Sequence, residues 1–193
     1  MNSQYKVNNK KKLHDGFFKL HEITFTHQKH DGSWSPLLKR EIFSGAQVVT
    51  VLPYDPIKKR ILLLKQFRAG VIDRKDDPVL TEIVAGIIDK DETPIQAAKR
   101  ECVEETGCLT NKLTEIYSYY PAPGSSESYY YLFLAEINAF EGNRIFGIEN
   151  ENEDILVNSY SVPEVKELLK EKKIINGVTL LALQWFFLEY YKD

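Results

Sequence analysis

The chain has 193 residues and a formal net charge of −3, which arises from 25 basic and 28 acidic side chains. This length suits one domain of ordinary size with an appendage. Hydrophobic residues make up 43% of the chain and charged residues 27%, which is typical of a globular protein in water. So small a net charge does not favour binding to nucleic acid, and we expect no nucleic-acid partner.

The first twelve residues are polar and weakly patterned, and we expect this segment, with its basic run Lys10–Lys12, to be mobile. A run rich in β-forming residues follows at Phe17–Thr26, and a turn at Asp31-Gly32 precedes a second run at Trp34–Phe43. We therefore predict a small β-hairpin unit over residues 1–45. It is too short to bury a core alone, so it should pack on the main domain, on a partner subunit, or on both.

The main domain is predicted over residues 46–193. Its strands are expected at residues 46–53, 60–67, 79–85, 112–120 and 127–137, with one more short strand after the polar segment 141–154. Besides a helix within residues 86–108, helices are expected near 163–172 and 177–191. Mixed strands with helices on both faces predict an α/β fold arranged as an α/β/α sandwich.

We predict no membrane span and no disulfide. The most apolar segment, Val178–Tyr191, is shorter than the ~20 residues that cross a bilayer and is interrupted by Gln184 and Glu189. No apolar stretch follows the early lysines, so we expect no signal peptide. The two cysteines, Cys102 and Cys108, do not suggest a disulfide or a metal site, and a reducing cytoplasm is the expected location.

Residues 86–108 read GIIDKDETPIQAAKRECVEETGC and carry the strongest functional signal. Glu101, Glu104 and Glu105 stand at positions i, i+3 and i+4 of the expected helix, within one arc of about 100° on its surface. Three crowded carboxylates repel one another unless a cation lies among them, and Mg²⁺ prefers oxygen ligands. The alternative is an amphipathic helix with a solvated acidic face.

Local signals define where this helix begins and ends. Thr93 and Gln96 form a capping box, Pro94 fits the first turn, and Gly107 suits the C-terminal stop. Arg100 is spaced for an ion pair with Glu104. Four residues are expected on the packing face opposite the glutamates: Ile95, Ala98, Cys102 and Val103.

This segment resembles the Nudix box, G-x5-E-x7-R-E-U-x-E-E-x-G-U, where U is a bulky apolar residue. All of its fixed positions are matched, by Gly86, Glu92, Arg100, Glu101, Glu104, Glu105 and Gly107. The two U positions hold the smaller Cys102 and Cys108. Seven fixed letters at roughly 7% usage each match by chance about once in 10⁸ starting positions, which disfavours the alternative of a merely solvated acidic face.

The resemblance implies the Nudix fold and hydrolysis of a diphosphate by water with the help of Mg²⁺, for which Mn²⁺ can substitute. It implies that Glu101 and Glu105 are direct metal ligands and that Glu104 is a ligand or a close neighbour of one. The main-chain carbonyl of Ala85 is the expected ligand that is not a carboxylate. Glu92 and Arg100 should hold the loop and the helix together.

Other segments resemble the ADP-ribose pyrophosphatases of this family. Pro123 lies 16 residues after Gly107, within YYPAPGSSE, near the proline that marks this subfamily. The similarity extends over about residues 37–190 and includes KREIF at 39–43, QFR at 66–68, EIVAG at 82–86 and ENEDI at 151–155. GDP-mannose pyrophosphatases have a very similar layout, so the pattern leaves ADP-ribose and GDP-mannose both open as substrates.

The same resemblance implies substrate-binding roles for five residues. Arg40 and Arg68 match arginines that bind phosphate or ribose, although either can instead be a surface ion-pair residue. Glu82 matches an acceptor for a ribose hydroxyl. Trp34 is expected to stack on adenine in its own or a neighbouring subunit, with packing as the alternative. Glu127 matches a glutamate near the distal half of the substrate, with a solvated loop charge as the alternative.

The acidic run at 149–154 corresponds to a loop that closes over the metals and delivers the catalytic base. Glu151 is the candidate base, and Glu153 is a candidate extra metal ligand or second base. Glu149 has no counterpart in this pattern, so the assignment among these glutamates stays open. Taken alone, the run reads as a solvated acidic loop.

The sequence therefore predicts a Mg²⁺-dependent hydrolysis of ADP-ribose to AMP and ribose 5-phosphate. The alternative is the same reaction on GDP-mannose or another nucleoside diphosphate sugar. A non-catalytic nucleotide-sensing module is disfavoured because all box glutamates are present. We also expect a homodimer through the N-terminal unit, because it carries too many aromatic residues for an exposed surface, namely Phe17, Phe18, Phe25, Trp34 and Phe43.

Overall fold

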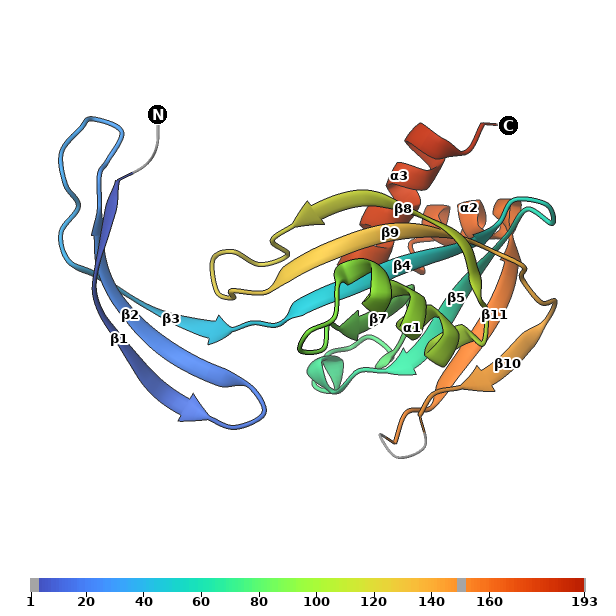
Figure 1. Ribbon diagram of the computed structural model, residues 1–193, viewed down its shortest axis with the longest axis horizontal. Helices are drawn as coiled ribbons and strands as arrows, with labels where there is room; N and C mark the ends of the chain where they lie inside the picture. Colours follow the sequence, from blue (N-terminus) through green and yellow to red (C-terminus); the bar gives the residue numbers. More distant parts are fainter. Residues whose placement is uncertain (1–3, 149–151, 193) are drawn as a thin grey trace. The chain divides into compact units, whose positions relative to one another are not determined.

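The computed structural model describes residues 4–148 and 152–192, which form two compact units (Figure 1). Unit 1 comprises Met1–Gln47 and Tyr120–Tyr129, and unit 2 comprises Val48–Tyr119 and Tyr130–Asp193. Unit 1 thus contains the segment 120–129 in addition to the N-terminal residues. The predicted boundary between residues 45 and 46 stays a prediction.

Unit 2 is built around an eight-stranded sheet. Six strands follow the order β10-β11-β5-β4-β9-β8, while β6 pairs with β5 and β7 pairs with β4. The strand bounds are β4 Gln47–Asp55, β5 Arg60–Phe67, β6 Val79–Glu82, β7 Val84–Ile87, β8 Thr110–Tyr119, β9 Tyr129–Ile137, β10 Asn143–Phe146 and β11 Ile155–Ser161. Strand β11 pairs antiparallel with both β10 and β5.

Helices cover both faces of this sheet, which confirms the predicted α/β/α sandwich. Figure 1 shows α1 (Pro94–Thr106) on one face, with α2 (Val162–Lys170) and α3 (Gly177–Trp185) on the other. Alternation along β4 explains the two layers, because Val49 and Val51 pack in the core beneath α1, while Leu52 and Tyr54 pack beneath α2 and α3. Each fully buried aliphatic side chain contributes about 1.5–3 kcal/mol.

Three features of unit 2 differ from the sequence prediction by more than a shift of one or two residues. The expected strand 79–85 is interrupted at Ile83, whose N–H donates to Thr179 Oγ1 at 3.1 Å instead of to a strand neighbour. The expected long C-terminal helix ends at Trp185 and continues as a π-helical turn, Phe186–Tyr190. The polar segment 141–154 contains strand β10, which was missed because it lies at the edge of the described sheet, paired with β11, and most of its residues are exposed.

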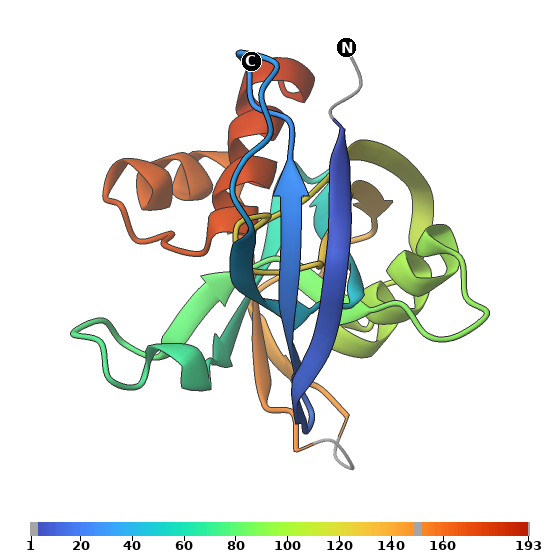
Figure 2. The same ribbon diagram turned by 90° about the vertical axis from the view of Figure 1, so that its left-hand side faces the viewer.

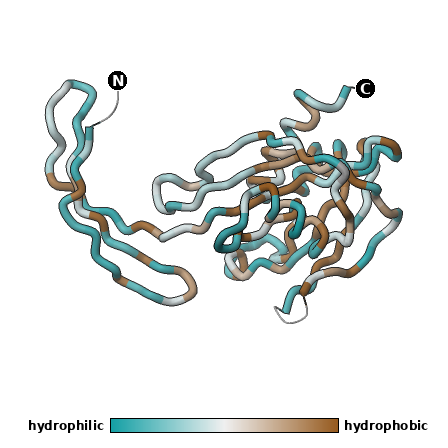
Figure 3. Tube along the Cα trace, viewed as in Figure 1, coloured by the Kyte–Doolittle hydropathy of each residue, from teal (hydrophilic) through white to brown (hydrophobic). Residues whose placement is uncertain are grey.

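Unit 1 contains a three-stranded antiparallel sheet in the order β1-β2-β3, with bounds Tyr5–Asp15, Lys19–His27 and Leu38–Ser44. The expectation of a mobile N-terminal segment is wrong, because Lys10–Lys12 lie in β1. This strand runs beside β2 along its whole length (blue in Figure 2). Its residues are all exposed, and its trace is mostly hydrophilic (Figure 3). Backbone pairing, not burial of side chains, therefore forms β1.

The segment 120–129 is joined to β3 by main-chain hydrogen bonds. The N–H of Phe43 donates to Ser125 O at 2.9 Å, and the N–H of Glu127 donates to Phe43 O at 3.0 Å. Gly45 packs against Ser128 so closely that a Cβ would overlap its backbone. This loop, which contains Pro123, is therefore part of unit 1.

In the part of the chain that the structure describes, no helix is long and apolar enough to cross a membrane.

Candidate functional site

Helix α1 begins and ends where the sequence predicts. Thr93 Oγ1 accepts from the N–H of Gln96, and Gln96 Oε1 accepts from the N–H of Thr93 at 2.9 Å, which completes the capping box. Pro94 occupies the first turn, and Gly107 ends the helix in the left-handed conformation with φ 67°. These local contacts fix where α1 begins and ends.

The buried face of α1 differs from the predicted one. Ala98 and Cys102 are buried as expected, but Ile95 is 53% exposed and Val103 is 39% exposed. Ala97 and Glu105 are buried in their place. The face of α1 that packs on the sheet is therefore rotated toward the glutamates, and Glu105 lies on this buried face.

Arg100 connects the loop before α1 to the carboxylates on the helix. Its Nε and Nη2 donate to the two oxygens of Glu92 at 3.0 and 2.9 Å, and Nη2 also donates to Ile87 O at 3.1 Å. Its Nη1 donates to Glu101 at 2.7 Å and to Glu104 at 2.9 Å. The predicted tie between Glu92 and Arg100 and the predicted pair between Arg100 and Glu104 are both confirmed.

Glu105, next to Glu104 on α1, has a buried carboxylate. It is 4% exposed, and its Oε2 accepts from the N–H of Ala85 at 3.1 Å. Burial raises the pKa of Glu105 to about 8, and the negative charges of Glu101 and Glu153 add to the shift, while Ala85 and Arg68 oppose it. Burial also raises the pKa of Glu101, with Glu104 and Glu153 adding to the shift and Arg100 opposing it. Such carboxylates gain most from a cation placed among them.

Gly86, within strand β7, makes room for the Glu101 carboxylate. A Cβ at this position would overlap the carboxyl carbon and both oxygens of Glu101. Only glycine, which has no side chain, leaves this space for the carboxylate, and we call the space the Gly86 cradle. The close approach places Glu101 against the main chain next to Ala85, the residue expected to offer its carbonyl.

These residues fit a divalent cation in the chemistry of their donors, since they supply carboxylate oxygens that repel one another in a partly buried place. Within residues 4–148 and 152–192, no three side chains of His, Cys, Asp or Glu form a ready-made metal cluster. Arg100 holds one oxygen of Glu101 and one of Glu104. A cation bound by these oxygens would share or compete for them with the guanidinium.

Glu153 approaches the same region from the connection between β10 and β11. Its N–H donates to Ile148 O, and its Oε2 accepts from the N–H of Ile148, both at 3.3 Å. Its charge acts on Glu101, Glu105 and Arg68. The candidate base Glu151 lies outside the described residues.

Arg68 and Glu82 form a second polar cluster in unit 2. Nε and Nη2 of Arg68 donate to Glu82 Oε2 at 2.9 and 2.6 Å, and Asn176 Nδ2 donates to Glu82 Oε1 at 3.0 Å. Burial lowers the pKa of Arg68, but the hydrogen bond and charge of Glu82, with the charges of Glu105 and Glu153, raise it overall. The negative charges of Glu105 and Glu153 thus act on Arg68. Asn176 was not predicted as a site residue, and only its position before the last helix signalled it as a cap.

Three predicted substrate-binding residues belong to unit 1. Trp34 is 50% exposed and follows strand β2 at an isolated bridge with Gln28. Arg40 lies exposed on β3, and its Nη1 donates to Lys39 O at 2.7 Å. Glu127 pairs with Lys10 at 2.8 Å. Their roles in binding stay predictions.

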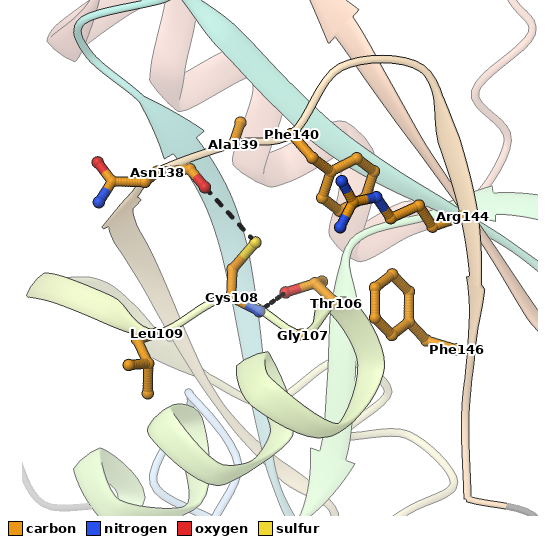
Figure 4. Close-up of a pocket in the computed structure, with 9 residues that line it drawn as sticks. All are labelled: Thr106, Gly107, Cys108, Leu109, Asn138, Ala139, Phe140, Arg144 and Phe146. Carbon is orange, nitrogen blue, oxygen red and sulfur yellow. Dashed lines mark hydrogen bonds between the residues drawn. The ribbon is translucent and has the colours of Figure 1, made fainter.

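A separate pocket of about 420 Å³ lies at the C-terminal end of α1 (Figure 4). Arg144 stacks on the ring of Phe140 at 4.5 Å, and Cys108 Sγ donates to Asn138 O at 3.8 Å. None of the predicted site residues lines this pocket. Its lining mixes apolar and polar side chains and contains no carboxylate, so it is distinct from the carboxylate cluster.

The chain is similar to a known family and to several known proteins. The family model described as NUDIX domain matches residues 46–181. An ADP-ribose pyrophosphatase of Escherichia coli strain K12 is 33% identical over 178 residues, which cover 92% of this chain and 85% of the relative. A GDP-mannose pyrophosphatase of Escherichia coli O1:K1 / APEC is 29% identical over 195 residues, which cover 100% of both chains.

A solved structure described as an ADP compounds hydrolase has a TM-score of 0.72 to this chain, and 95% of each chain is covered. The two are 18% identical, so this likeness concerns the fold alone.

Proposed function

Because this chain belongs to the Nudix family, we propose that it is a pyrophosphohydrolase that cleaves ADP-ribose to AMP and ribose 5-phosphate. The observation that carries the proposal is the buried Glu105 on the same helix as Glu101, whose carboxylate fits the space that Gly86 of strand β7 leaves. A purely structural role gives no reason to bury the Glu105 carboxylate next to that of Glu101.

Enzymes of this family generally use a divalent metal ion, and we propose Mg²⁺, with Mn²⁺ as a substitute. Glu101, Glu105 and the carbonyl of Ala85 would hold it, with Glu104 and Glu153 as further ligands. When bound, such an ion neutralises the phosphate oxygens and lowers the pKa of water. Glu104 accepts from Arg100, and Glu153 accepts from the N–H of Ile148.

The protein's own groups then bind the diphosphate and move a proton. Arg68 would bind phosphate oxygens through its guanidinium, whose planar fork suits that geometry. Glu151, or Glu153 in its place, would take the proton from the attacking water as general base. Water forms a bond to one phosphorus, the bridging P–O bond breaks, and the other phosphate leaves with its sugar.

ADP-ribose is proposed ahead of other nucleoside diphosphate sugars. The ADP-ribose pyrophosphatase relative has the higher identity, at 33%, whereas the GDP-mannose pyrophosphatase relative has 29% but covers the whole chain. GDP-mannose is therefore the second candidate substrate. Trp34, Arg40 and Glu127 are the proposed contacts from unit 1.

We also propose a homodimer formed through unit 1. Phe17 is 86% exposed, Phe18 is 65% exposed, and both Trp34 and Phe43 are about half exposed, which leaves much aromatic surface to be covered. Both cysteines are free thiols, which supports work in a reducing cytoplasm.

The proposal is tested by assaying the purified chain on a panel of nucleoside diphosphate sugars, with Mg²⁺ and with EDTA. We expect ADP-ribose to have the highest kcat/KM and EDTA to abolish hydrolysis. A higher kcat/KM for GDP-mannose would make the second candidate substrate correct. No hydrolysis of any member of the panel would refute the enzymatic function.

The two loop glutamates are separated by Glu151→Gln and Glu153→Gln. Loss of the general base should lower kcat and leave KM nearly unchanged, since that group acts in the transition state. If only Glu153→Gln loses activity, the base is Glu153. If neither substitution matters, the acidic run is a solvated turn and the base lies elsewhere.

A further inference from the structure

Asn176 does more than begin helix α3. Its Oδ1 accepts from the N–H of Thr179 at 3.0 Å and from Thr179 Oγ1 at 2.9 Å, which is the usual work of a capping side chain. Capping uses only this oxygen, so the amide nitrogen is available. Here Nδ2 donates to Glu82 Oε1 at 3.0 Å, across 94 positions of the sequence.

Glu82 receives hydrogen bonds on both of its oxygens. Asn176 holds Oε1, while Arg68 donates to Oε2 through Nε and Nη2 at 2.9 and 2.6 Å. The Glu82 side chain is 5% exposed, so it has little contact with water that could replace these donors. The carboxylate is thus fixed from the α3 side and from the Arg68 side at once.

The guanidinium of Arg68 is planar and rigid, so fixing two of its nitrogens fixes the third. Within residues 4–148 and 152–192, the hydrogen bonds of Arg68 use Nε and Nη2 and leave Nη1 available. The Arg68 side chain is 39% exposed. The edge of the guanidinium with Nε and Nη2 is therefore bonded to Glu82, while Nη1 is available to a ligand.

A second contact joins the start of α3 to the same strands. Thr179 Oγ1 accepts from the N–H of Ile83 at 3.1 Å, at the break between β6 and β7. Ile83 follows Glu82 directly and stands two residues before Ala85, whose N–H holds Glu105. The first turn of α3 is therefore connected to Arg68 through Glu82, and to the strand segment whose Ala85 binds Glu105 through Ile83.

We propose that Asn176 is a positioning residue, which acts through Glu82 to hold the Arg68 guanidinium in the orientation that binds the substrate diphosphate. This inference rests on the proposed function and deepens it, since it assigns a role in that site to a residue outside it. The competing interpretation is that Asn176 only caps α3. The two interpretations predict different effects on KM when Asn176 is replaced by another residue that can cap the helix.

Asn176→Ser separates the two roles. Serine caps a helix about as well as asparagine but is too short to keep the contact with Glu82. We expect KM for the nucleoside diphosphate sugar to rise about tenfold with kcat within about twofold, because Arg68 binds the diphosphate before and during the reaction. The thermal midpoint should also fall by several degrees, because Oε1 of the buried Glu82 loses its donor. Asn176→Asp, which also keeps the cap but puts a carboxylate against Glu82, should raise KM further.

The matched control is Ser161→Ala at the N-cap of α2. Ser161 accepts from the N–H of Glu164 in a capping box of its own and has no contact with Glu82. This variant should lower the thermal midpoint and leave KM unchanged. If Ser161→Ala raises KM as much as Asn176→Ser, the effect is one of general stability and the inference is refuted.

A second readout follows the Arg68 Nε–H signal by NMR, assigned by its loss in Arg68→Lys. The signal should exchange slowly with water in the wild type and fast in Asn176→Ser. A tenfold rise in KM with a still-protected Nε–H would refute the route through Glu82. An active wild type with unchanged KM in Asn176→Ser would refute the inference alone. An inactive wild type would refute the proposed function, and the inference with it.

Discussion

Gly86→Ala should separate activity from stability in this protein. The added Cβ would overlap the Glu101 carboxyl group, which is the far end of a flexible side chain and can move aside. Gly86 does not have a positive φ, so alanine fits its backbone. The variant should therefore fold, with Glu101 turned away from the main chain next to Ala85.

The cost in stability follows from the contacts that change. Turning Glu101 out of its rotamer costs about 0.5–1.5 kcal/mol, and its hydrogen bond with Arg100, at 2.7 Å, contributes about 1.5–3 kcal/mol. Alanine returns about 0.4–1 kcal/mol by restricting the unfolded chain. We expect a net loss of about 1–4 kcal/mol in the free energy of unfolding, which a typical domain survives.

The loss of activity should be much larger. A displaced metal ligand should lower kcat by at least ~10²-fold at saturating Mg²⁺. Steady-state hydrolysis and thermal unfolding measure the two effects on the same samples. Gly177→Ala is the control, because a Cβ there meets nothing within 4 Å, and alanine favours a helix by up to about 1 kcal/mol. A folded Gly86→Ala enzyme with wild-type kcat would refute the role of the Gly86 cradle.

Two further predictions concern the helix cap and the assembly. Thr93→Ala removes the capping box of α1 and should cost about 1 kcal/mol, which thermal unfolding would register as a midpoint about 2–4 °C lower; an unchanged midpoint would contradict it. Replacing the exposed Phe17 and Phe18 by serine should weaken the homodimer, as measured by sedimentation, whereas a fully active wild-type monomer of 22.3 kDa would rule the dimer out.

Helix α1 could be predicted closely because its determinants are local. The capping box, the proline and the terminal glycine all lie within the segment that they define, and the structure places each as expected. The sequence did not reveal which edge of the helix the sheet covers. The spacing places Glu101, Glu104 and Glu105 on one arc, but only the packing against β7 determines that Glu105 is the buried one.

Features that depend on tertiary contacts were missed. Strand β1 is polar and exposed, so it has no hydrophobic alternation to indicate it, and its pairing with β2 forms it. Asn176 could be recognised as a helix cap before Gly177, yet its contact with Glu82 joins residues 94 positions apart. The break at Ile83 likewise reflects a hydrogen bond to Thr179 in a distant helix.

The most direct test of the account compares the wild type with Glu105→Gln in the rate of AMP formation from ADP-ribose as Mg²⁺ is increased. Glutamine keeps the size of the buried side chain and removes its charge. We predict no reaction in EDTA, a rate that saturates with Mg²⁺ in the wild type, and a maximum at least ~10²-fold lower in Glu105→Gln. Hydrolysis without a divalent cation, or a wild-type maximum in Glu105→Gln, would contradict the claim that the glutamate helix holds the catalytic metal.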